Sequence, residues 1–145
     1  MILDALLELA DGQSGTTSVA STNVIDTLAG GDAYAGGMAG LFFVTRVATS
    51  FTATGTTVNL TFQLQTADTE DFSGASPVTL VQSAELKAAA LTAGKIIALP
   101  IPAGAKRYIR GYKEVEDSTA GTNVFSAGAW DMYISKDSPI TRELA

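Results

Sequence analysis

The side chains of this chain that could do chemistry are mainly carboxylates, because the sequence contains no histidine and no cysteine. Ser-His-Asp and Cys-His catalysis and imidazole or thiolate metal sites are therefore excluded. Glu114, Glu116 and Asp117 cluster after a predicted strand. Such groups could serve a paired-carboxylate glycosidase, but they are also typical of a solvated strand end that leads into a turn. We expect the second role, and no catalytic residue.

A second acidic group, Asp68, Glu70 and Asp71, superficially resembles a calcium-binding loop. An EF-hand loop needs glycine at its sixth position and glutamate at its twelfth. Counted from Asp68, those positions hold Ser73 and Thr79. We therefore expect an ordinary acidic loop, with no metal and no cofactor.

The basic residues crowd one later segment, at Lys106, Arg107, Arg110 and Lys113. In a strand, successive side chains point to opposite faces. Arg110 would then share a face with Tyr108 and Tyr112, whereas the opposite face would carry Arg107, Ile109 and Lys113. Because the positive charge is split and the net charge is −6, we expect no nucleic-acid partner. These cations are predicted to neutralise carboxylates of neighbouring strands or of a partner.

The elements that must position these groups are strands. Val58, Leu60, Phe62 and Leu64 alternate strictly with polar residues, which indicates a strand with one buried and one wet face. Turn-rich stretches separate eight predicted strands, at residues 16–21, 23–28, 41–51, 57–66, 78–83, 95–101, 107–115 and 123–135. Short strands with frequent turns favour an all-β antiparallel sandwich.

At 145 residues the chain is predicted to form a single β-sandwich domain. Residues 83–91 are the best helix candidate, since Ser83 can cap an alanine-rich run. Residues 1–13 are a candidate N-terminal arm and residues 29–40 a glycine-rich loop. The acidic N-terminus does not resemble a secretory signal, and Lys95 interrupts the longest apolar run. We expect a soluble protein with no membrane partner.

Two segments carry apolar residues on both strand faces, residues 41–44 and 123–135. Ser126 and Gly128 make the second segment thinner and suggest a bulge. Two-sided apolar character predicts a strand that is covered on both sides, by its own fold or by a second subunit. The self-association candidates are Phe42, Phe43, Phe125, Trp130 and Tyr133.

Several segments, in the same order along nearly the whole chain, resemble a known family: residues 1–4, 21–26, 64–68 with Phe72 and Ser73, 98–102, 107–110 and 127–129. Together they resemble a tailed-bacteriophage capsid cement (decoration) protein of the jelly-roll type, as in a Bordetella podovirus. The resemblance implies a jelly-roll sandwich on the outer capsid surface of the virion, made in the host cytoplasm. There it would bridge neighbouring subunits of the phage major capsid protein as a homo-oligomer, with a homodimer favoured and a trimer possible.

A cement protein needs apolar patches and arms that become covered on the shell. The capsid-contact candidates lie in the arm and in the glycine-rich loop: Ile2, Leu3, Leu6, Leu7, Asp32 and Tyr34.

Two other functions fit the same residues. A carbohydrate-binding jelly roll would stack sugar rings on exposed aromatic residues, with Tyr108, Tyr112, Trp130 or Tyr133 as candidates. An enzyme would use Glu114 and Glu116, which share one strand face.

Overall fold

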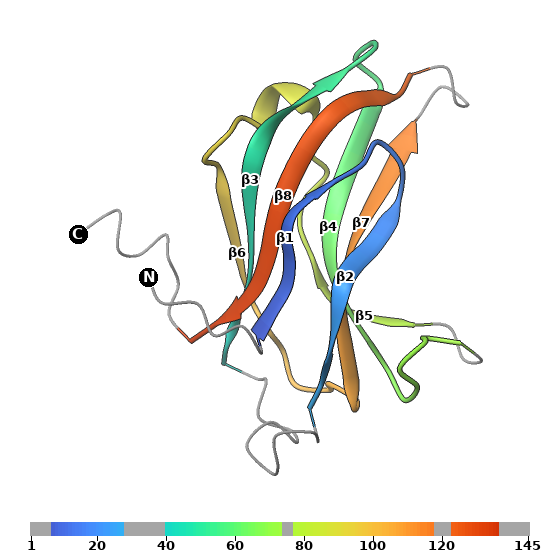
Figure 1. Cartoon of the computed structure of the whole chain (residues 1–145), viewed down its shortest axis with the longest axis vertical. Helices are drawn as coiled ribbons and strands as arrows, with labels where there is room; N and C mark the ends of the chain where they lie inside the picture. The colour runs from blue at the N-terminus through green and yellow to red at the C-terminus, as the bar shows by residue number, and fades with distance from the viewer. Residues whose placement is uncertain (1–6, 28–39, 74–76, 118–122, 137–145) are drawn as a thin grey trace.

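The computed structural model describes residues 7–27, 40–73, 77–117 and 123–136, and these form two four-stranded antiparallel sheets stacked face to face (Figure 1). One sheet has the order β1-β8-β3-β6 and the other β2-β7-β4-β5. These orders are those of a jelly roll, so the predicted all-β sandwich is confirmed. The strands are β1 (Glu8–Ser14), β2 (Val19–Asp26), β3 (Phe42–Ala53), β4 (Val58–Ala67), β5 (Val78–Gln82), β6 (Ile96–Pro100), β7 (Tyr108–Asp117) and β8 (Phe125–Ser135).

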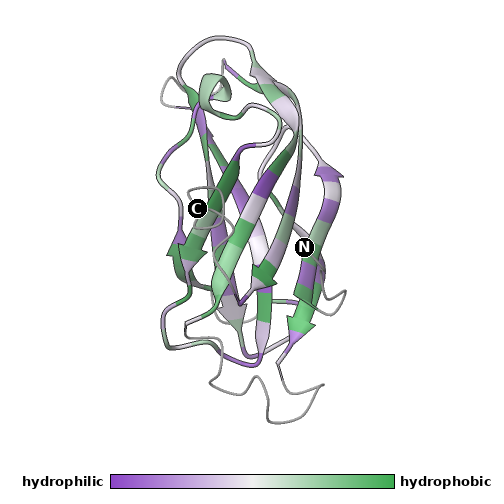
Figure 2. Cartoon of the chain, turned by 90° about the vertical axis from the view of Figure 1, so that its left-hand side faces the viewer, coloured by the Kyte–Doolittle hydropathy of each residue, from purple (hydrophilic) through white to green (hydrophobic). Residues whose placement is uncertain are grey.

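The alternation in β4 places its apolar side chains between the sheets. Val58, Leu60, Phe62 and Leu64 are each exposed by no more than 1%. Figure 2 shows the same banding of apolar and polar residues along the other strands. The core is therefore the layer of side chains that each sheet turns toward the other.

An aromatic cluster fills this core. The Phe51 ring meets the Phe125 ring edge to face at 5.6 Å and stacks on Trp130 at 5.9 Å. The predicted bulge lies beside the cluster, where the register between β3 and β8 shifts. Gly128 has a φ of +149° there, and a Cβ at this position would collide with the Phe51 ring. The bulge brings Phe125 and Trp130 into the same core although the parity of their positions differs.

The predicted helix at residues 83–91 is wrong. Only Ala88–Ala90 turn, as the 3₁₀ turn η2. Upstream of it the chain runs extended beside β4, because the Ser83 amide donates to the Phe62 carbonyl at 2.9 Å. Leu86 and Leu60 likewise exchange backbone hydrogen bonds of 2.8 and 2.9 Å. These tertiary hydrogen bonds override the helical propensity of the alanines.

The predicted arm is also wrong in part, because residues 8–13 belong to β1 and Leu9 is fully buried. Residues 1–6, which begin the predicted arm, lie outside the described residues. So do residues 28–39, which include nearly all of the glycine-rich loop. The strands predicted at residues 16–21 and 23–28 are one strand, β2, with a register shift between Ala20 and Val24.

In the part of the chain that the structure describes, no helix has the length and apolar character needed to cross a membrane.

Candidate functional site

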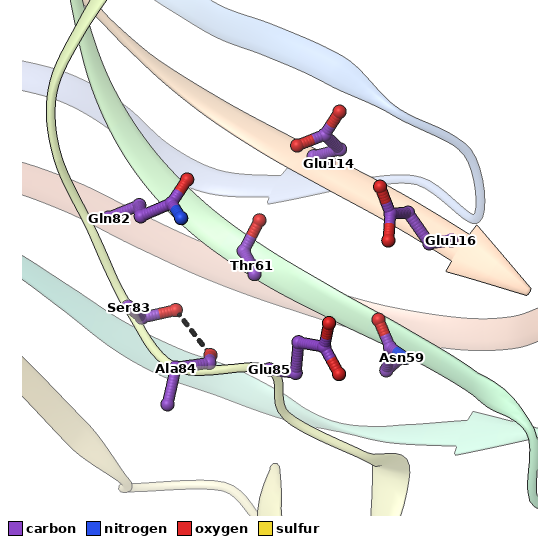
Figure 3. Close-up of a pocket in the computed structure, with 8 residues that line it drawn as sticks. All are labelled: Asn59, Thr61, Gln82, Ser83, Ala84, Glu85, Glu114 and Glu116. Carbon is purple, nitrogen blue, oxygen red and sulfur yellow. Dashed lines mark hydrogen bonds between the residues drawn. The ribbon is translucent and has the colours of Figure 1, made fainter. Parts of the chain in front are cut away.

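A polar groove lies on the outer face of the β2-β7-β4-β5 sheet, with a cavity volume of about 250 Å³ (Figure 3). It brings together carboxylates from two elements: Glu114 and Glu116 on β7, and Glu85 from the segment after β5. Asn59 and Thr61 of β4 lie between them. The predicted sharing of one face by Glu114 and Glu116 is therefore confirmed, while Glu85 was missed because its segment was assigned to a helix.

The third predicted carboxylate, Asp117, is used for structure. Its Oδ1 accepts a hydrogen bond from the Thr57 hydroxyl at 2.7 Å and its Oδ2 one from the Asn123 amide at 2.9 Å. In the groove itself, Glu114 Oε2 accepts from Gln63 Nε2 at 2.5 Å. No three acidic side chains of the described residues are grouped so that they could hold a metal ion. The groove offers hydrogen-bond acceptors to a ligand, and it is built by the sheet together with the segment that follows β5.

The acidic loop after β4 makes its contacts within the protein. Asp68 forms a 2.9 Å ion pair with Lys106. Asp71 accepts hydrogen bonds from the Ser73 hydroxyl at 2.7 Å and the Ser73 amide at 3.0 Å, and these bonds lower the pKa of the Asp71 carboxyl. The resulting turn places Phe72, with a φ of +56°, over the outer face of the sheet, where its side chain is buried.

Of the four clustered cations, Arg110 and Lys113 lie on opposite faces of β7, as predicted, whereas Lys106 and Arg107 precede the strand. Lys106 and Arg107 neutralise neighbouring carboxylates, since Arg107 forms a 2.9 Å ion pair with Asp26 that raises the pKa of its guanidinium. Arg110 and Lys113 make other contacts, which sequence reasoning did not find.

Arg110 lies on the outer face of β7. Its Nε donates to Gln65 Oε1 at 2.9 Å, and its guanidinium carbon lies 4.2 Å from the centre of the Phe72 ring. The Tyr112 ring is 5.5 Å away. Partial burial lowers the pKa of Arg110, because a buried guanidinium loses contact with water.

Lys113 points into the core from the opposite face of β7 and is fully buried. Its Nζ donates to the Gly15 carbonyl at 2.5 Å and lies 4.2 Å from the centre of the Trp130 ring. Burial lowers the pKa of Lys113 from 10.5 to about 8. A lysine in such a position holds the β1–β2 turn against the core.

A protein-family model named Bbp16 matches residues 9–130, which run from β1 into β8. This chain belongs to the Bbp16 family. The family name indicates a Bordetella phage protein, so the chain is phage-related. A search of curated proteins found no match.

Three of the five self-association candidates lie in the core of this Bbp16-family chain: Phe43, Phe125 and Trp130. Tyr133 lies on the outer face of β8, where it lines a groove with Arg46 and Asp131. All four residues are exposed by no more than 4%, so they are unavailable to a second subunit. Only Phe42, half-buried at the start of β3, is left at the surface. The same burial prevents Trp130 and Tyr133 from stacking on a sugar, whereas Tyr108 and Tyr112 are partly exposed.

Of the capsid-contact candidates, only one lies within the described residues of the Bbp16-family chain. Leu7 is partly buried and packs against the core, directly before β1. The others are outside the described residues: Ile2, Leu3, Leu6, Asp32 and Tyr34.

The two lateral sides of the Bbp16-family sandwich differ in whether the backbone groups of the edge strands are occupied. Where β1 lies beside β2 (Figure 1), side chains bond to the backbone of both edge strands. Gln13 bonds to the Ala20 carbonyl and the Thr22 amide at 2.8 and 3.1 Å, and Asn23 donates to the Glu8 carbonyl at 3.2 Å. These bonds occupy edge groups that could otherwise pair with another chain.

The opposite side ends in β6, which pairs on one edge with β3. Backbone hydrogen bonds join Val47 to Lys95 and Ile101 to Leu41. Because hydrogen-bonded pairs alternate along antiparallel strands, the odd-numbered residues of β6 are the ones that bond to β3. The N–H and C=O groups of Ile96 and Ala98 therefore point away from β3. Within the described residues, no strand pairs with this free edge.

Proposed function

We propose that this chain is a capsid cement protein that binds the outer surface of a phage head and bridges neighbouring major capsid subunits. The observation that carries the proposal is the family match, because it covers residues 9–130 and hence nearly all of the two-sheet body. The rest of the molecule supports it. A rigid jelly roll that presents the free edge of β6 is suited to adhesion, and it requires no turnover of a substrate.

In this proposal the protein resides on the outside of the virion, where its partners are the major capsid protein and a second copy of itself. Many copies on a repeating lattice would hold firmly through contacts that are individually modest. The free edge of β6 supports a homodimer, since two antiparallel β6 edges could exchange backbone hydrogen bonds around Ala98.

The dimer is tested by Ala98→Pro, which removes an N–H group on the free edge without removing a hydrogen bond to β3. Ala98→Thr is the matched control, because it keeps the N–H and favours a strand. We expect the proline variant to elute as a monomer and the threonine variant as a dimer in size-exclusion chromatography with light scattering. A wild-type monomer, or a proline variant that stays dimeric, would contradict the β6 interface.

The cement role is tested on phage that lack the gene for this protein. Their heads should lose DNA at a lower temperature and after a milder osmotic shock than wild-type heads. Purified protein added back should sediment with the heads and restore their robustness. Heads that are equally robust without the protein, and that do not bind it, would rule the role out.

A further inference from the structure

A second surface of the chain is built for recognition, on the outer face of β7. Tyr108, Arg110 and Tyr112 alternate along this face. Val24, opposite Arg110 on β2, is 37% exposed. Tyrosine and arginine are the residue types most often found at energetic centres of protein interfaces, particularly beside a partly buried apolar group.

Arg110 is held in place before any partner arrives. A chain of hydrogen bonds runs beneath it, from Arg110 Nε to Gln65 at 2.9 Å, from Gln65 to Gln63 at 3.1 Å and from Gln63 to Glu114 at 2.5 Å. Gln63 and Gln65 are both buried although they lie on the outer face of β4. The guanidinium carbon also lies 4.2 Å from the centre of the Phe72 ring, and this contact further restrains the side chain. Little side-chain entropy is left to lose on binding.

The positive charge of Arg110 is not neutralised within the described residues. Arg46 and Arg107 form ion pairs with Asp131 and Asp26 at 2.8 and 2.9 Å. Arg110 instead bonds to a neutral amide and two rings, and its terminal nitrogens have no hydrogen-bond or ion-pair partner among the described residues. A partly buried cation without a counter-charge is costly, and a carboxylate would offset that cost.

The geometry points to Arg110 as the receptor for an aspartate or glutamate side chain of the major capsid protein, bound by two parallel hydrogen bonds from the terminal guanidinium nitrogens. This inference rests on the proposed cement function. A planar fork of donors matches a carboxylate, and the bond from Nε to Gln65 leaves the two terminal nitrogens for it.

The test measures binding to phage heads that lack this protein, by co-sedimentation over a range of protein concentrations. Arg110→Gln should weaken binding about tenfold or more, because it leaves the partner's carboxylate unpaired. Arg110→Lys should also weaken it, because an ammonium group keeps the charge but lacks the fork. Arg107→Gln is the matched control on the same strand end and should bind within about twofold of wild type. Thermal unfolding verifies that each variant is folded.

A second measurement identifies the partner group. Heads whose surface carboxylates have been amidated with carbodiimide and ethanolamine should bind wild type and Arg110→Gln equally. If wild type binds heads but either Arg110 variant binds as tightly, the inference is wrong and the cement function stands. If the difference persists on amidated heads, the ligand is not a carboxylate and the inference is also wrong. If wild type itself fails to bind heads, both proposals fall together.

Discussion

Each face of β7 carries a cation beside an aromatic ring, but one cation is buried in the core and the other lies on the outer face. On the inner face, Lys113 is fully buried, with its Nζ on the Gly15 carbonyl and 4.2 Å from the Trp130 ring. On the outer face, Arg110 lies 4.2 Å from the Phe72 ring and bonds to Gln65. In both places an aromatic ring stands where a carboxylate would be expected. The rings keep the cations in place but leave much of their charge uncompensated.

The consequence differs because of solvent. The uncompensated charge of Lys113 is sealed in the core, so it acts on the stability of the fold. Arg110 lies at the surface, so a partner can supply the missing counter-charge. We therefore expect changes on the inner face to move the free energy of unfolding and changes on the outer face to move binding to the capsid.

The largest effect should follow from Trp130→Ala. Trp130 is exposed by only 1% and contacts both Phe51 and Lys113, so its removal leaves a cavity beneath a buried charge. We expect a loss of about 3–5 kcal/mol in the free energy of unfolding, measured by chemical denaturation.

Two variants control this measurement. Trp130→Phe keeps an aromatic face and removes the indole N–H, which has no hydrogen-bond partner among the described residues, so it should cost much less. On the outer face, Tyr112→Ala should cost no more than about 1 kcal/mol. If Tyr112→Ala destabilised the protein as much as Trp130→Ala, the contrast between the two faces would be wrong.

Lys113→Met should stabilise the protein at pH 7, by about 1–3 kcal/mol. Methionine fills a similar volume, and it removes the cost of burying a charged amine. That gain exceeds the loss of the hydrogen bond to Gly15 and of the contact with Trp130. Lys113→Ala is the control, because it removes the charge but leaves a cavity, and it should be less stable than Lys113→Met.

The same lysine should make stability depend on pH. The pKa of Lys113 is about 8 in the folded protein and 10.5 when unfolded, so between these values the unfolded chain binds more protons. The contribution of Lys113 to the free energy of unfolding therefore rises with pH across that window, by about 3 kcal/mol in all. The difference in unfolding free energy between Lys113→Met and wild type should shrink from pH 8 to 10.5, and a constant difference would contradict a shifted lysine.

Much of this contrast was within reach of the sequence. The alternation of residues 57–65 predicted β4, and the alternation of residues 107–113 placed Arg110 and Lys113 on opposite faces. Alternation does not say which face is inside. Lysine is rarely buried, and it is the register with β4, which pairs Lys113 with the buried Phe62, that places Lys113 on the inner face.

Two wrong predictions each have an identifiable structural cause. Parity assigned Phe125 and Trp130 to opposite faces of β8, which suggested a surface for a second subunit, but the bulge at Gly128 brings both into the core. The helix prediction at residues 83–91 followed from alanine content, and it failed because Leu86 pairs with Leu60. The bulge itself was predicted from Ser126 and Gly128, but its effect on the faces of β8 depends on the pairing with β3. The pairing of Leu86 with Leu60 is a long-range feature that local composition does not encode.

A smaller effect is expected from Phe72→Ala, which removes the ring beneath Arg110. The lost burial and the lost cation–π contact should lower the free energy of unfolding by about 2 kcal/mol. Phe72→Gly separates the ring from the backbone, because glycine adopts the φ of +56° without strain. The glycine variant should be at least as stable as the alanine variant. A less stable glycine variant would show that the backbone at this position is not strained.

The smallest effect should come from Arg107→Gln, which breaks the ion pair with Asp26 just before β7 begins. Both partners are accessible to water, so the pair is screened and its loss should leave the midpoint of thermal unfolding unchanged. Wild type and variant should also have equal unfolding midpoints at a higher salt concentration. Arg107→Gln is therefore the reference for Arg110, since the two arginines carry the same charge on the same segment and differ in whether a described residue supplies a carboxylate. A clear drop in the unfolding midpoint of Arg107→Gln would show that the surface contacts of Arg107, with Asp26 and with the Tyr108 ring, stabilise this end of the sheet.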